Sequence, residues 1–199
     1  MQNGPQCSGL CSPGYMCPGA TAKPEPCSAG GYCVGSNPGA APCKEGTFSN
    51  VTGLSSPELC IQCPAGRACR AGSVAPSECY PGTVAVAGAA RCSRCEAGRF
   101  QSESGETACH ECSSGSFCSE GASAALPCPK GRYMNVSLET MTSAADCIAC
   151  RPGHFCSTGA TEPTACAPGT VAPNASMGAC VKCEAGRFQS DNGETACVP

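Results

Sequence analysis

The chain has 199 residues, of which 23 are Cys, 25 are Gly and 18 are Pro, and its formal net charge is -3. About one residue in nine is therefore Cys, which is typical of disulfide scaffolds or metal-binding chains and excludes an ordinary globular domain. Leu, Ile, Val and Phe supply about a tenth of the residues, too few for a packed core. We expect local order that comes from covalent cross-links.

Charge and hydropathy exclude two classes of partner. The 12 Lys and Arg residues are spread thinly, so neither a nucleic-acid interface nor a polybasic lipid contact is expected. No apolar stretch approaches the roughly 18 residues of a transmembrane helix, so we expect no direct membrane insertion. The opening MQNGPQ has no basic start and no apolar run, which predicts a fragment without its own signal peptide.

One phrase, Cys-x-x-Gly, recurs along the whole chain at steps of 16 or 17 residues, with two longer steps of 20 and 22. Each copy contains one further Cys, so a repeat of about 16 residues with two cysteines organises the sequence. The copies begin at Cys11, Cys27, Cys43, Cys63, Cys79, Cys95, Cys112, Cys128, Cys150, Cys166 and Cys183.

Short and long copies combine into a larger unit. The pattern from Cys60 to Cys109 returns from Cys147 to Cys197 at an offset of 87 or 88 residues, which indicates internal duplication. We predict three parts: short Cys-x5-Cys repeats over 7–59, a first superrepeat over 60–146 and a second, truncated one over 147–199.

Each copy predicts a small β-hairpin. Gly at the fourth place suits a tight turn with positive φ, so substitution of Gly98 should distort its copy. Stretches such as GTFSNVT and GRFQSES predict short strands that end in a polar turn. An aromatic or apolar residue two places after the Gly is expected to form a miniature core, at Tyr32, Phe48, Val84, Phe100, Phe117, Tyr133, Phe155, Val171 and Phe188.

The predicted fold class is therefore small and disulfide-rich: an elongated tandem array of short β-hairpin modules with little helix and a minimal hydrophobic core. The simplest connectivity joins the two cysteines of each copy. For the long copies this gives Cys43–Cys60, Cys79–Cys92, Cys95–Cys109, Cys128–Cys147, Cys166–Cys180 and Cys183–Cys197. For the Cys-x5-Cys copies it gives Cys11–Cys17, Cys27–Cys33, Cys63–Cys69, Cys112–Cys118 and Cys150–Cys156, where crossed patterns remain open. Cys7 is left unpaired.

Cys-x-x-Cys pairs raise two chemical alternatives, a zinc site and a redox centre. The run from Cys92 to Cys112 approaches four-thiolate zinc spacing, but it keeps the register of all other repeats. We interpret each pair as a junction between modules and expect no metal and no cofactor. The pairs are Cys60/Cys63, Cys92/Cys95, Cys109/Cys112, Cys147/Cys150 and Cys180/Cys183.

No catalytic constellation emerges, so we expect no enzyme. His110 and His154 have no acid or serine arrangement around them and are predicted to be exposed loop residues. The acidic segments 103–106 and 191–194 lack the dense oxygen spacing of a calcium loop. Sequons at Asn50, Asn135 and Asn174 lie in long inter-cysteine loops and predict N-glycosylation.

The segments CSRCEAGRFQSESGETACHEC and CVKCEAGRFQSDNGETAC resemble the ephrin type A/B receptor-like cysteine-rich repeat, and units such as CRPGHFC look like a variant. The resemblance implies distant kinship with tumour-necrosis-factor-receptor and epidermal-growth-factor-like modules. It implies an extracellular glycoprotein segment, secreted or part of a membrane-protein ectodomain, and no kinase activity.

Three functions remain as hypotheses. The first is a structural spacer or adhesion rod of a larger protein. The second is a ligand-binding receptor ectodomain whose protein or glycan partner is unknown. The third is an intracellular zinc-binding or redox protein. The first two require the secretory pathway and an extracellular or cell-surface location.

Overall fold

The computed structural model describes residues 11–17, 23–35 and 39–199. Its chain divides into two compact units, Met1–Ser93 with Glu103–Ala108, and Arg94–Ser102 with Cys109–Pro199. Cys7, for which we expected no partner, lies outside the described residues. The three-part division by superrepeats stays a prediction.

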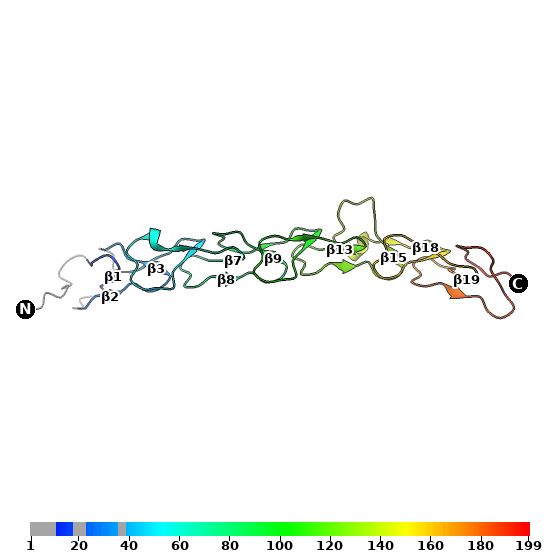
Figure 1. Ribbon diagram of the computed structural model, residues 1–199, viewed down its shortest axis with the longest axis horizontal. Coiled ribbons are helices and arrows are strands. Elements are labelled where there is room, and N and C mark those ends of the chain that lie inside the picture. The colour runs from blue at the N-terminus through cyan, green and yellow to red at the C-terminus, as the bar shows by residue number, and fades with distance from the viewer. Residues whose placement is uncertain (1–10, 18–22, 36–38) are drawn as a thin grey trace, which may run out of the picture. The chain divides into compact units, whose positions relative to one another are not determined.

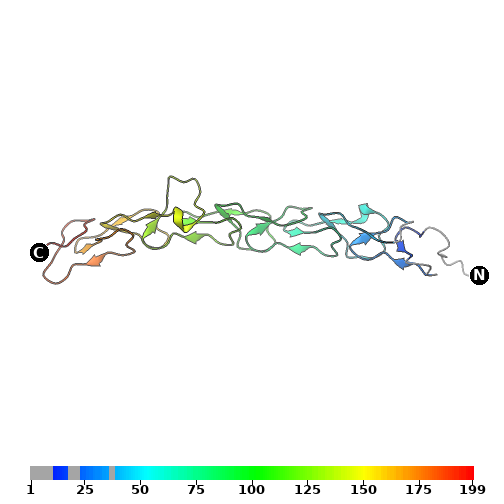
Figure 2. The ribbon, with the colours of Figure 1, turned by 180° about the vertical axis from the view of Figure 1, so that it is seen from behind.

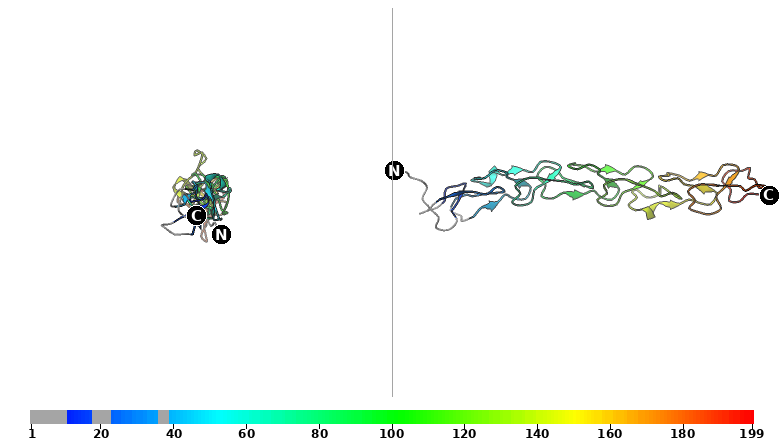
Figure 3. Two further views of the ribbon diagram at one scale, coloured as in Figure 1. Left: turned by 90° about the vertical axis from the view of Figure 1, so that its left-hand side faces the viewer. Right: turned by 90° about the horizontal axis from the view of Figure 1, so that it is seen from below.

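Two-residue strands make up all the sheet structure of the described residues, and they form ten two-stranded sheets. Within each unit the hairpins follow one another along the chain (Figure 1, Figure 3). The strands are β1 (Tyr15–Met16), β2 (Glu25–Pro26), β3 (Gly31–Tyr32), β4 (Ala41–Pro42), β5 (Thr47–Phe48), β6 (Ile61–Gln62), β7 (Arg67–Ala68), β8 (Ser77–Glu78), β9 (Thr83–Val84), β10 (Ser93–Arg94), β11 (Arg99–Phe100), β12 (His110–Glu111), β13 (Ser116–Phe117), β14 (Leu126–Pro127), β15 (Arg132–Tyr133), β16 (Ile148–Ala149), β17 (His154–Phe155), β18 (Thr164–Ala165), β19 (Thr170–Val171) and β20 (Val181–Lys182).

The register of each hairpin follows from the repeat. The first strand is formed by the two residues after the Gly of Cys-x-x-Gly, which we call the turn glycine, and the second by the two residues before the next Cys-x-x-Gly. In the hairpin of β5 and β6, for example, Thr47 lies opposite Gln62 and Phe48 opposite Ile61. The Cys N–H that follows the second strand continues the ladder, as where Cys63 donates to the Gly46 carbonyl at 2.9 Å.

Helix is confined to two single turns among the described residues. η1 (Pro57–Leu59) and η2 (Ala144–Asp146) are 3-10 turns, and each ends just before the second Cys of a long module. The eleven disulfides of residues 11–17, 23–35 and 39–199, their antiparallel hairpins and this scarcity of helix confirm the predicted fold class.

The cysteines are buried more deeply than most of the residues expected to form miniature cores. Most described disulfide cysteines are buried, whereas Phe100 and Phe155 are half-buried. Among the expected core residues Val171 is 7% exposed and Phe117 packs against a buried cluster, but Phe188 is 57% exposed, which corrects the prediction at that position. The buried position lies three residues after the turn glycine, one place beyond the ring. It holds a Cys in the short modules and Ser49, Ala85, Gln101, Ala172 or Gln189 in long ones.

Neighbouring modules are joined by backbone hydrogen bonds at the turn glycine. The glycine N–H donates to the carbonyl of the buried residue three places after the next turn glycine, as from Gly46 to Cys69 and from Gly153 to Ala172, both at 2.8 Å. This bond is made by Gly14, Gly30, Gly46, Gly66, Gly98, Gly131, Gly153 and Gly169. No disulfide of the described residues links two modules, so these bonds and the packing around them hold consecutive modules together.

A turn glycine is required for two separate reasons. Gly66 has a φ of 75°, a left-handed conformation that side chains disfavour. A Cβ on Gly66 would also overlap the carbonyl oxygen of Gly105, two modules further along the chain. The same overlap is found at Gly30 with Gly72, at Gly46 with Gly88 and at Gly153 with Gly193.

The two reasons can be separated by substituting two turn glycines. Gly169 has a φ of 79° and would have nothing within 4 Å of its Cβ. Gly169→Ala should cost about 1–2 kcal/mol, from the left-handed backbone alone. Gly66→Ala should cost about 1–3 kcal/mol more, because the overlap with Gly105 is with rigid backbone. Amide hydrogen exchange in each module measures both costs, and equal costs would contradict the packing requirement.

Candidate interaction surface

The structure joins the two cysteines of every described repeat, so each disulfide closes a loop inside one module. The long modules have Cys43–Cys60, Cys79–Cys92, Cys95–Cys109, Cys128–Cys147, Cys166–Cys180 and Cys183–Cys197. The short ones have Cys11–Cys17, Cys27–Cys33, Cys63–Cys69, Cys112–Cys118 and Cys150–Cys156, with no crossed pairing.

The two cysteines of each Cys-x-x-Cys pair belong to different disulfides. Cys60 bonds to Cys43, whereas Cys63 bonds to Cys69. The two residues between them are strand β6, and positions three apart in an extended strand point to opposite faces. A disulfide sulfur is not the thiolate that zinc or a redox motif needs. No group of three metal-binding side chains is found in the described parts of the chain.

Both histidines lie in strands rather than in loops, which corrects that part of the prediction, whereas the expected exposure is confirmed for His110. His110 belongs to β12 and lies across the hairpin from Phe100, with ring centroids 6.0 Å apart. His154 belongs to β17, is half-buried, and its Nε2 lies 3.0 Å from the guanidinium of Arg151. Neither contact assembles a nucleophile or a general base.

The acidic segment 191–194 is organised by a neighbouring amide. Gln189, which is 9% exposed, accepts a hydrogen bond from the Asp191 N–H at 3.0 Å and donates to the Ala196 carbonyl at 2.9 Å. Asp191 and Glu194 themselves are exposed. This arrangement fixes a turn.

One module departs from the repeat, and the departure is clearest beside its counterpart in the first unit. Leu54 and Met141 occupy equivalent places, since both are 5% exposed and their carbonyls accept bonds from Cys33 and Cys118. The Cys43–Cys60 loop spans 17 residues and the Cys128–Cys147 loop spans 19. Between the sequon and the buried residue, the first has a single Gly53 and the second has 138–140.

With residues 138–140 in place of a single glycine, the segment 136–140 forms a projecting loop. The loop stands out from the second unit in two opposite views (Figure 1, Figure 2). Val136 is 78% and Leu138 is 40% exposed, so apolar side chains meet solvent there. At other turn glycines the close neighbour is the backbone of a turn two modules further along, as Gly88 is for Gly46. At Gly98 this neighbour is Thr140, since a Cβ on Gly98 would lie 2.8 Å from the Thr140 methyl carbon.

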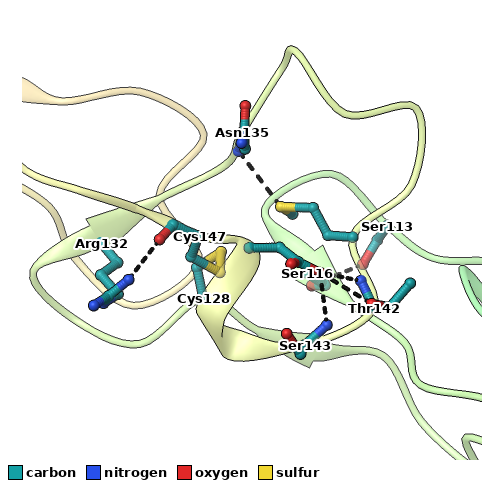
Figure 4. Close-up of a disulfide and its surroundings, with 10 residues drawn as sticks. Ser113, Ser116, Cys128, Arg132, Asn135, Thr142, Ser143 and Cys147 are labelled. Carbon is teal, nitrogen blue, oxygen red and sulfur yellow. Dashed lines mark hydrogen bonds between the residues drawn. A yellow bond between two sulfur atoms is a disulfide. The ribbon is translucent and has the colours of Figure 1, made fainter.

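The base of loop 136–140 is anchored by a small apolar cluster. Met141 packs with Cys128 and Cys147, and Phe117 and Met134 cover them. The Met141 sulfur accepts the Asn135 N–H at 3.4 Å, and Arg132 donates to the Cys147 carbonyl at 2.7 Å (Figure 4). The cluster holds the two ends of the loop while its tip stays in solvent.

A hollow of about 390 Å³ lies beside this loop within the second unit. Leu138 and Thr140 line it from the loop, together with the apolar Met134. Arg99 and Glu111 also line it and pair with each other at 3.1 Å. Polar and apolar groups therefore meet at one exposed concavity, which we take as the candidate interaction surface.

Asp146 fastens the other side of the loop. Its Oδ2 accepts hydrogen bonds from the Thr142 N–H at 2.7 Å, from the Ser143 N–H at 3.0 Å and from the Thr142 hydroxyl at 3.1 Å (Figure 4). The backbone bonds from Thr142 and Ser143 stabilise the carboxylate and hold the pKa of Asp146 below its ordinary value of 3.8. The clamp is thus intact at neutral pH.

The sequons are dispersed over three long modules. Asn50 and Asn174 are exposed, whereas Asn135 is half-buried at the foot of loop 136–140. The Asn135 Oδ1 accepts the Ser137 N–H at 3.1 Å. The site that sequence reasoning missed is loop 136–140, and its signal was the absence of a Gly after Ser137.

Comparison with known families bears on residues 82–125. They match the family model described as tyrosine-protein kinase ephrin type A/B receptor-like, which confirms the resemblance expected from the motifs. No curated protein matches the chain. In the parts of the chain described by the structure, no helix is both long and apolar enough to cross a bilayer.

The Asp146 clamp predicts an acid-sensitive loop. A carboxyl whose pKa is lowered by folding adds stability above its unfolded pKa, and that stability is lost as pH falls through the lower folded value. The Thr142 and Ser143 amide NMR signals should therefore shift below about pH 3.8. Asp146→Asn should give the shifted positions already at pH 7, whereas Glu139→Gln on the exposed loop should not. Identical spectra for wild type and Asp146→Asn would refute the clamp.

The disulfides should contribute according to loop length. Removing Cys128–Cys147 by double Ala substitution should cost roughly 3 kcal/mol, and removing Cys63–Cys69 roughly 2 kcal/mol, because the longer loop restricts the unfolded chain more. The measurement is the free energy of opening of each module by hydrogen exchange, with the other cystines intact. A larger cost for the shorter loop would show that native packing, and not chain entropy, dominates.

Proposed function

We propose that this segment is a non-catalytic structural spacer of a larger extracellular protein. The ephrin receptor-like match over 82–125 and the disulfides support an extracellular repeat region, and that module family is non-catalytic. The observation that carries the spacer role is the repeated joint at the turn glycine. Each unit is a succession of modules bonded to their sequence neighbours in one register.

Such joints support a spacer because they need no particular side chain. Covalent loops hold each module, while backbone N–H and carbonyl groups and close glycine contacts hold consecutive modules. A chain built in this way can present solvent-facing residues of many kinds without losing its connection. The abundance of exposed small and polar residues agrees with that role.

Small-angle X-ray scattering tests the spacer directly. A compact globule of this length would have a radius of gyration of about 16 Å. We expect a clearly larger value that is unchanged in moderate salt, because the joints are hydrogen bonds and packing rather than ion pairs. A value near that of a compact globule would reject the spacer.

Thiol titration tests the intracellular alternative. The unfolded, unreduced chain should show at most one thiol, since the described cysteines are paired and Cys7 alone is expected to be free. Several free thiols, or release of zinc on unfolding, would instead support a zinc-binding or redox protein.

A second candidate function, recognition of a protein partner, is favoured by loop 136–140 alone. Its exposed Val136 and Leu138 lie beside a hollow, in the module that departs from its counterpart in the first unit. Replacing 138–140 by a single Gly, as at Gly53, should leave the disulfides and the thermal midpoint in place but abolish binding of the purified chain to target cells. Unaltered cell binding by this variant would remove the candidate.

A further inference from the structure

Long and short modules share a second turn with a left-handed residue. Its N–H donates to the carbonyl of the first Cys in the preceding module, for instance from Gly53 to Cys27 and from Gly159 to Cys128, both at 2.8 Å. The residues at this place are Gly53, Gly72, Gly88, Gly105, Gly121, Gly159, Ser176 and Gly193. Ser176 is the exception in a set of glycines.

Ser176 keeps the geometry of the glycines it replaces. Its φ is 61°, and it is the single non-glycine residue with positive φ among the described residues. Its N–H donates to the Cys150 carbonyl at 2.8 Å, and its own carbonyl packs against Gly131. The module therefore fixes a left-handed residue here, which strains a serine and does not strain a glycine.

The fold itself does not use the serine side chain. Ser176 is exposed, and within the described residues its hydroxyl has no hydrogen-bond partner. Gly would provide the same backbone bonds with less strain. The reason for a hydroxyl at this position must lie outside the packing of the module.

The hydroxyl completes the sequon Asn174-Ala175-Ser176, in which all three residues are exposed. We propose that Asn174 carries an N-linked glycan and that Ser176 is present, despite its backbone strain, as the acceptor hydroxyl of that sequon. The proposal rests on the extracellular role above, since it needs passage through the secretory pathway.

The chemistry is a glycosyl transfer from a lipid diphosphate-linked oligosaccharide. The Asn174 amide nitrogen bonds to C1 of the first sugar, the C1–oxygen bond to the lipid diphosphate breaks, and one amide proton is lost. No oxidant or reductant takes part. The product keeps the backbone N–H of Ser176, so its bond to Cys150 is unaffected.

The other two sequons do not carry this argument. In Asn50-Val51-Thr52 the hydroxyl residue precedes the left-handed position, so Gly53 remains there and no strain arises. Asn135 is half-buried and its side-chain oxygen already accepts the Ser137 N–H. Of the three sequons, the one at Asn174 has its hydroxyl residue, Ser176, at the left-handed position of the turn.

The test uses the whole chain, secreted from cultured eukaryotic cells, with peptide mass spectrometry at Asn174. We expect a glycan on Asn174 in the wild type, and its loss in Asn174→Gln, Ser176→Ala and Ser176→Gly. After enzymatic removal of all glycans, Ser176→Gly alone should melt at a higher temperature than the wild type, because it alone relieves the left-handed strain. Ser176→Ala is the matched control that removes the hydroxyl and keeps the strain.

The outcomes separate this inference from the spacer. A secreted, disulfide-bonded and extended chain with an unmodified Asn174 overturns the glycan and leaves the spacer intact. A chain that is glycosylated at Asn174 but has a compact scattering profile supports the glycan and rejects the spacer. A chain retained in the cell with free thiols rejects both. A Ser176→Gly variant no more stable than Ser176→Ala overturns the account of strain.

Discussion

Close approach of one backbone segment to another at the turn glycine holds the modules of this protein together. Gly46 has a left-handed φ, and its N–H bonds to the next module along the chain. A Cβ on Gly46 would overlap the carbonyl oxygen of Gly88, which lies two modules further along. A side chain would disturb all three features at once. The repetition of Cys-x-x-Gly is therefore a packing requirement as well as a turn requirement.

Disulfides stabilise single modules, whereas contacts at the turn glycines join one module to the next. Each cystine restricts one module, which compensates for the scarcity of large apolar side chains. Backbone bonds then join module to module, so no cystine of the described residues has to cross between them. The same division explains why the two cysteines of a Cys-x-x-Cys sequence belong to different disulfides, as Cys60 and Cys63 do on either side of a two-residue strand.

The candidate functional positions are those at which a module departs from the repeat. Three residues in place of Gly53 produce loop 136–140, anchored by Met141 and clamped by Asp146. A serine in place of a glycine leaves Ser176 in a strained but exposed turn. In both cases the module keeps its disulfide and still bonds to its neighbour, through the Met141 carbonyl in the first and the Ser176 N–H in the second. The framework therefore tolerates a change that serves something other than folding.

The module can be predicted from the spacing of its residues. Spacing alone gave the repeat, the turn glycines and the hairpins, and pairing within each repeat yields the same cystines that the structure contains. Local chain geometry governs these features, since the paired cysteines are separated by 6 to 19 residues. Tertiary structure decided which side chains are buried, placing the residue beyond the ring inside and leaving Phe188 exposed. It also decided the loop at 136–140 and the strain at Ser176, because both depend on contacts with other modules that no local pattern records.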